Sequence, residues 1–230
     1  MRVKTSDIIA LPLQLGSAIR GRRIFHPLGV LASGRIERTA PAHRGLPIES
    51  ADVLARVSKA LGTPGGLPDL IGLAWRMPAV PSDAHPWDVL MASTGGGALS
   101  RFTLLPTTSW ADTTLSTLMP LRWQGQWWWL RARLRSTGPH DLTLDALDDA
   151  LKAGTMVFDI EQADGTASFE TLATLTLTAR IPTDESHDVS FDPTRNTRSG
   201  LDLGPRWLTG LRERAYMRSR RGRGAPEEPA

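Results

Sequence analysis

The 230-residue sequence contains no cysteine. Disulfide bonds, thiolate catalysis, cysteine-ligated zinc and iron–sulfur clusters are therefore excluded. A metal ion bound by this chain would need histidine, tyrosine, methionine or carboxylate ligands. Tyrosine occurs once, as Tyr216, and histidine five times, so few side chains are candidates for such a site.

Lysine is also scarce, with three lysines among the 27 basic residues. The positive groups are thus nearly all guanidiniums, which suit planar, bidentate recognition of carboxylate or phosphate. The alternative explanation, which we favour for the total count, is a genome-wide preference for arginine codons. Only particular arginines can therefore support a functional argument.

No apolar run near the N-terminus is long enough to span a membrane. The run that follows Asp7 is interrupted by Pro12 and Gln14. We expect a soluble, cytoplasmic protein with no membrane contact. At this length we expect one domain, residues 1–224, and a frayed tail at residues 225–230.

Several well-known catalytic motifs are missing as well. The run TGGGALS at 94–100 lacks the lysine of a Walker phosphate loop, and no HExxH or GxSxG motif occurs. We expect TGGG to connect two strands.

The pattern of apolar residues predicts mostly β-strands. Short apolar runs between turn-forming residues, and runs that alternate apolar and polar residues, are typical of antiparallel strands. These runs lie at residues 23–37, 70–77, 87–93, 100–106, 126–135 and 167–181.

Three segments have features of helices. The clearest is residues 143–154, with Thr143 as a cap, an apolar stripe and a terminal glycine. Residues 50–61 have a possible cap and helical spacing, although they could also include the start of a strand. Residues 204–223 place Pro205 at a first helical position. Antiparallel strands with peripheral helices predict an α+β domain, in which the sheet can close into a barrel.

His26 is the one histidine that lies in an apolar, extended stretch, GRRIFHPLGVLASG at 21–34. Histidine is the side chain best suited to proton transfer near neutral pH. A lone buried histidine is nevertheless more often a packing residue. Spacing alone leaves both interpretations open.

Arg212 precedes Tyr216 by four residues, so the two share a face if the segment is helical. A nearby guanidinium stabilises a phenolate, and phenolate is one of the protein ligands of ferric haem. The alternative is a surface tyrosine on a basic helix.

Two further runs have simpler explanations than ligand binding. RSRRGRG at 218–224 could contact nucleic acid, but a solvated tail explains it more simply, and we expect no nucleic-acid partner. WQGQWWW at 123–129 predicts an aromatic core or the interface of a homo-oligomer, with ligand stacking as a further alternative.

Taken in order, these segments resemble the haem-binding core of the catalases. RIFHPLGVLASG resembles the distal motif of that family, which implies that Arg23 binds a haem propionate and that His26 is the distal histidine. LARVSKALGTPGGLPDLIGLAWRM resembles the next block. There the resemblance implies that Arg56 binds a propionate and that Ser58 supports the distal histidine.

PWDVLMAST is similar to the tryptophan–aspartate segment of the family, with one departure. The position of the distal asparagine is occupied by Ala92, with Ser93 beside it as a candidate replacement. A one-residue slip of a strand would turn the Ser93 side chain to the other face of the sheet.

The C-terminal run FDPTRNTRSGLDLGPRWLTGLRERAYMRSRRGR carries the most specific part of the resemblance. It implies that Tyr216 is the iron ligand, that Arg212 stabilises its phenolate and that Arg223 binds a propionate. The whole resemblance covers residues 20–224.

The resemblance implies a closed antiparallel β-barrel of the catalase type and haem b, iron protoporphyrin IX, as cofactor. The substrates would be a peroxide and a small-molecule reductant. Since alanine cannot donate the hydrogen bond of an asparagine, we expect weak hydrogen peroxide dismutation and mainly peroxidase activity on organic hydroperoxides. The alternatives are a non-catalytic haem carrier or sensor, and a haem-free barrel that binds another ligand.

Overall fold

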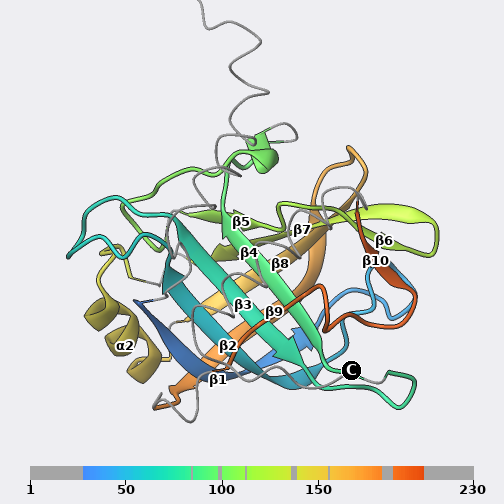
Figure 1. Cartoon of the computed structure of the whole chain (residues 1–230), viewed down its shortest axis with the longest axis horizontal. Helices are drawn as coiled ribbons and strands as arrows, with labels where there is room; N and C mark the ends of the chain where they lie inside the picture. The colour runs from blue at the N-terminus through green and yellow to red at the C-terminus, as the bar shows by residue number, and fades with distance from the viewer. Residues whose placement is uncertain are drawn as a thin grey trace, which may run out of the picture.

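The computed structural model describes ten strands, one α-helix and one short 3-10 helix (Figure 1). The described residues are 28–83, 85–97, 100–111, 113–135, 139–154, 156–182 and 189–204. The strands are β1 (Leu28–Arg38), β2 (Ala51–Lys59), β3 (Ile71–Met77), β4 (Trp87–Ser93), β5 (Thr114–Ser116), β6 (Leu121–Trp123), β7 (Gln126–Leu134), β8 (Val157–Asp164), β9 (Glu170–Arg180) and β10 (Leu201–Leu203).

The strands form a closed antiparallel barrel. Hydrogen-bonded neighbours follow the order β7, β5, β4, β3, β2, β1, β9 and β8, and pairing of β7 with β8 closes the ring. Strands β6 and β10 extend the sheet beyond β7, at the right of Figure 1. The expected closed antiparallel barrel is therefore confirmed.

Most of the expected strands are present. Strand β1 covers the described part of the extended stretch at 23–37, and β3, β4, β7 and β9 form where alternating or short apolar runs predicted them. The predicted helix is α2 (Leu144–Lys152), and the Thr143 hydroxyl accepts a hydrogen bond from the backbone N–H of Ala146. These segments carry enough local signal to define their own structure.

Two predictions were wrong. The segment at 50–61 forms strand β2 rather than a helix, because Val53, Ala55 and Val57 alternate into the core while both edges of the strand pair with neighbours. The segment at 100–106 contains a 3-10 helix, Ser100–Phe102, and beyond it only an isolated bridge between Thr94 and Leu104. The backbone N–H of Thr103 bonds to the Ser100 carbonyl, so the chain turns where an extended strand was expected.

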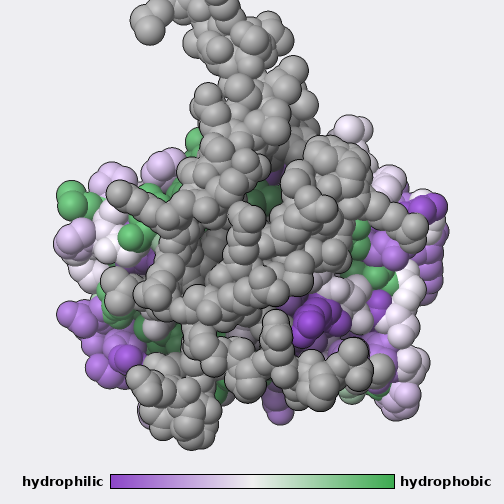
Figure 2. All heavy atoms as spheres, viewed as in Figure 1, coloured by the Kyte–Doolittle hydropathy of each residue, from purple (hydrophilic) through white to green (hydrophobic). Residues whose placement is uncertain are grey.

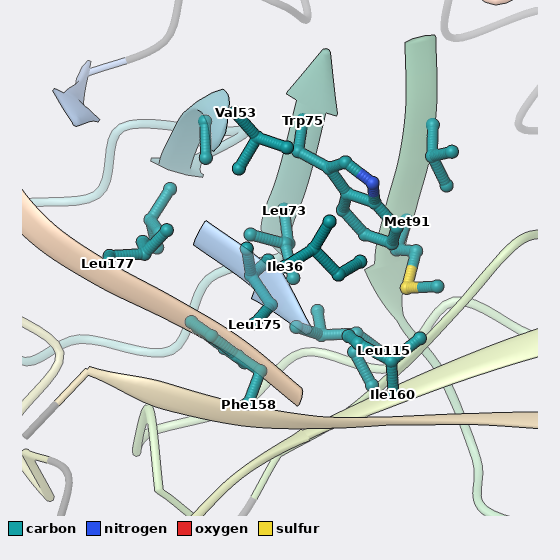
Figure 3. Close-up of a cluster of buried hydrophobic side chains, with 14 of the residues drawn as sticks. Ile36, Val53, Leu73, Trp75, Met91, Leu115, Phe158, Ile160, Leu175 and Leu177 are labelled. Carbon is teal, nitrogen blue, oxygen red and sulfur yellow. The ribbon is translucent and has the colours of Figure 1, made fainter. Parts of the chain in front are cut away.

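Apolar side chains fill the inside of the barrel. Figure 3 shows side chains from β1, β2, β3, β4, β5, β8 and β9 meeting in one cluster. Trp75 is the largest of the fully buried ones. Helix α2 covers one end of this interior, where Leu147 and Leu151 lie close to Val30 and Val57. The inside of the barrel is therefore a packed apolar core.

The peripheral helices of the expected α+β fold are represented, among the described residues, by α2 alone. The predicted helix at 204–223 lies outside the described residues, apart from Gly204. Within the described ranges, no helix has both the length and the apolar character needed to cross a membrane.

Candidate functional site

Strand β2 presents different residues on its two faces. Val53, Ala55 and Val57 belong to the core, whereas Arg56 and Ser58 point to the outer face of the barrel. Arg56 is buried even though it lies on this outer face, with 9% of its surface exposed. Other parts of the chain must therefore cover the outer face at this point.

A row of small residues crosses strands β1 to β4 at Ser58. Ser58 lies opposite Gly29 on β1 and Gly72 on β3, and Gly72 lies opposite Ala92 on β4. Residues that face each other across antiparallel strands point to the same side of the sheet. These four residues, the small-residue row, therefore leave a strip of outer face with no side chain larger than serine.

Close packing limits substitutions in the small-residue row. A Cβ at Gly29 would lie 2.6 Å from the Val57 carbonyl oxygen and 2.8 Å from the Cβ of Ser58. A Cβ at Gly72 would lie 3.2 Å from the Ser58 hydroxyl oxygen. The two glycines thus keep the surroundings of the Ser58 hydroxyl clear of side chains.

The row becomes polar beyond β4. Ala92 lies opposite Ser116 on β5, and Ser116 lies opposite Arg131 on β7. The Ser116 hydroxyl is held by the Thr94 hydroxyl, at 3.0 Å, and Arg131 is paired with Glu161, at 2.6 Å. The strip without large side chains therefore ends at β4.

Ser93 points away from this strip. Its side chain is 1% exposed, and its hydroxyl accepts a hydrogen bond from the backbone N–H of Ile71 at 3.2 Å. By strand alternation, Ser93 and Ala92 point to opposite faces of β4. The structure thus brings Arg56, Ser58 and Ala92 to one face, and it does not bring Ser93 to them.

Phe191 lies next to Arg56. The Cζ atom of Arg56 is 6.0 Å from the centroid of the Phe191 ring, and the Cζ atom of Arg76 is 5.5 Å from the same centroid. Phe191 itself is 8% exposed. A segment distant in sequence therefore packs against the outer face of β2 and β3.

Asp88 attaches that segment to the barrel. Its buried carboxylate accepts two hydrogen bonds from Arg76, at 2.7 and 2.8 Å, and one each from the Asp192 backbone N–H and the Asn196 side-chain amide, both at 2.7 Å. Hydrogen bonding to Asp88 raises the pKa of Arg76 above its ordinary value, although burial of the guanidinium opposes this. A charged network therefore holds residues 190–196 in place.

Sequence reasoning treated the tryptophan–aspartate segment and the Phe-x-Pro segment as separate blocks. The structure joins them, because Asp88 from the first segment binds Asp192 and Asn196 of the second, and its partner Arg76 binds the Ser190 carbonyl on the other side of Phe191. The roles of Asp88, Arg76 and Phe191 were missed. The available signal was an aspartate that falls on the buried strand β4, since a buried carboxylate needs cationic or N–H partners.

Exposed leucines lie at the same end of the barrel as Ser58 and Ala92. Leu61 and Leu67, in the loop that follows β2, are each 58% exposed, and Leu105 is 44% exposed. The backbone N–H of Leu105 bonds to the carbonyl of Ser93, the last residue of β4. Figure 2 shows apolar side chains on this edge, at the left, over the β2–β3 loop of Figure 1. This end of the barrel therefore has an apolar rim.

The remaining candidate residues lie outside the described residues. They are Arg23, His26, Arg212, Tyr216 and Arg223, and the basic run at 218–224 and the tail at 225–230 lie there as well. Across the described part of the chain, no group of three or more His, Asp and Glu side chains could hold a metal ion.

Comparison with protein-family models gives no match, and comparison with curated proteins gives none either.

Proposed function

We propose that this protein binds haem b against the outer face of β1–β4 and acts as a peroxidase on organic hydroperoxides. The observation that carries the proposal is the convergence of three separate sequence blocks at one place. Arg56, Asp88 and Phe191 come from three of the segments that resemble the catalase core. The Phe191 ring lies near the guanidinium of Arg56, two residues before Ser58 on β2, and Asp88 binds the backbone of Asp192 next to that ring.

Two features of the described residues support a flat, dianionic cofactor. The small-residue row provides a strip on which a planar ring system can lie, and Arg56 places a positive charge next to it. A guanidinium is suited to hold a propionate carboxylate. In the proposal Arg23 and Arg223 bind the propionates together with Arg56, and Tyr216 is the iron ligand, with Arg212 stabilising its phenolate.

Bound haem would supply the two-electron reduction of the peroxide. His26 would move a proton from the inner to the outer peroxide oxygen, a transfer worth about 10² to 10⁴ in rate. Ser58 would hold His26 in position. The methyl group of Ala92 can donate no hydrogen bond, and Ser93 points to the other face, so hydrogen peroxide would be held poorly.

The apolar rim supports organic hydroperoxides as substrates. Leu61, Leu67 and Leu105 remain exposed at the end of the barrel that carries Ser58 and Ala92. Apolar contacts there can contribute binding energy that hydrogen peroxide is too small to use. An external small-molecule reductant would complete the cycle.

The first experiment is a haem titration of the full chain. We expect a Soret band at one haem per chain, with a changed spectrum in Tyr216→Phe. Arg56→Met should weaken haem binding by about 10- to 100-fold, as expected for loss of a charged hydrogen bond. Arg35→Met, a change at an exposed arginine of β1, is the matched control. The absence of a Soret band in the parent protein would refute the proposal.

The second experiment measures turnover of cumene hydroperoxide with a chromogenic reductant. We expect His26→Ala to lose most of the activity, and His43→Ala, a change at an exposed loop histidine, to retain it. Haem binding without turnover would instead favour a carrier or sensor. Loss of the hydrogen-bond donor at Ala92 is the observation that supports this second candidate.

A further inference from the structure

Hydrogen bonds hold the backbone on both sides of Phe191. On one side, Arg76 Nη2 donates a hydrogen bond to the Ser190 carbonyl oxygen at 2.8 Å. On the other side, the backbone N–H of Asp192 donates to the Asp88 carboxylate at 2.7 Å. Because Asp88 also binds Arg76, a single ion pair anchors both neighbours of Phe191. The ring therefore has little freedom to move relative to β3 and β4.

The guanidiniums of Arg76 and Arg56 both lie near this ring. The fork of Arg76 is engaged by the Asp88 carboxylate and the Ser190 carbonyl. Arg56 lies one row along β2 from Ser58, and its guanidinium faces the Phe191 ring at 6.0 Å. A cation is attracted to the face of an aromatic ring, so a fixed ring limits the positions that the cation adopts.

We infer that Phe191 is a positioning residue that holds Arg56 in the orientation needed to bind a carboxylate of the ligand. This inference rests on the proposed function, in which the carboxylate is a haem propionate. Asp88 and Arg76 act on Arg56 indirectly, because they hold the backbone that carries the Phe191 ring. The orientation of Arg56 on the barrel thus depends on a segment more than 130 residues further along the chain.

The test compares haem with haem dimethyl ester, which has the same ring system but no carboxylate charge. In the full chain, we expect Phe191→Leu to weaken haem binding about three- to tenfold, in line with one lost cation–π contact. Binding of the dimethyl ester should stay unchanged. Phe191→Tyr keeps the ring and should restore the affinity for haem. In an Arg56→Met background, Phe191→Leu should have no further effect.

Phe169→Leu is the matched control, because Phe169 also lies under guanidiniums, those of Arg101 and Arg131, on another part of the barrel. It should change neither affinity. Equal losses for haem and its ester in Phe191→Leu would indicate general damage to the site and would overturn the inference. An additive loss in the Arg56→Met background would overturn it too.

A second measurement separates this inference from the proposed function. The Nε–Hε resonance of Arg56 in the haem-free chain is identified by its loss in Arg56→Lys. We expect it to shift in Phe191→Leu, to be largely kept in Phe191→Tyr and to be unchanged in Phe169→Leu. If the parent binds no haem but these shifts occur, the proposed function fails while the positioning of Arg56 stands. If the Arg56 resonance does not shift in Phe191→Leu, the inference that Phe191 positions Arg56 is wrong.

Discussion

Replacement of Asp88 by alanine should strongly destabilise the barrel. The Asp88 carboxylate is 1% exposed and accepts four hydrogen bonds, two of them from Arg76. Removing one partner of a buried ion pair costs about 3–5 kcal/mol. A domain of this kind is stable by about 5–15 kcal/mol in total. Asp88→Ala should therefore remove a large share of the free energy of unfolding.

The loss can be measured by urea denaturation of the full chain. With a slope of about 2–3 kcal/mol/M, the midpoint should fall by about 1–2.5 M. Asp159→Ala is the matched control. Asp159 forms an ion pair with Arg135 on the same barrel, but the side chains of Arg135 and Asp159 are 48% and 38% exposed. An exposed pair of this kind contributes about 0–1 kcal/mol, so the control should change the midpoint little.

A double-mutant cycle with Arg76 tests the cause. The expected cause of the lost stability is that the Arg76 guanidinium is left without its carboxylate partner. In that case the double variant Arg76→Met with Asp88→Leu should lose less free energy of unfolding than the sum of its two single changes, by about 0.5–3 kcal/mol. Because hydrogen bonding to Asp88 raises the pKa of Arg76 above its ordinary value, the contribution of the pair is fully present below that ordinary value and is lost only as the pH rises through the raised pKa. Additive losses, or a loss below about 1 kcal/mol for Asp88→Ala, would refute the role given to this pair.

Three further changes are also measurable by urea denaturation. Arg38→Lys should cost about 1.5–3 kcal/mol, because Arg38 donates to five backbone carbonyl oxygens of the β1–β2 connection and an ammonium has only three donors; an unchanged midpoint would contradict this. Gly29→Ala should cost about 1–3 kcal/mol, since its Cβ would come within 2.6 Å of the Val57 carbonyl oxygen, whereas Gly125→Ala would meet no atom within 4 Å and should show only the strain of its positive φ. Thr143→Ala should cost about 1 kcal/mol through loss of the α2 cap, with Thr143→Ser as the variant that retains it.

Local patterns predicted much of the barrel. Strands β3, β4, β7 and β9 and helix α2 form where alternation, turn residues and the Thr143 cap indicated them. Strand β2 was mistaken for a helix because SADVLARVSKAL fits both periodicities. Only its pairing with β1 and β3 selects the extended form, and that pairing involves residues remote in sequence.

In the candidate site, too, some residues were predicted from the sequence and others were revealed only by the tertiary structure. Arg56, Ser58 and Ala92 were identified from the resemblance, and the register places Ser58 and Ala92 in one row on the outer face. Ser93 was a candidate replacement for the missing donor, but alternation along β4 turns it to the other face. The network of Asp88, Arg76 and Phe191 was not predicted at all.

The sequence by itself determined which chemistry is open to this protein. The absence of cysteine excludes thiolate and iron–sulfur sites, and alternating apolar residues define a two-faced sheet. Only the tertiary structure decided which face carries the candidate site and what holds it. Closure of the barrel fills the interior with apolar side chains and places Arg56, Ser58 and Ala92 on the outer face. The contacts from Asp88 to the residues around Phe191 cross more than 100 positions of the chain, so no local pattern could encode them.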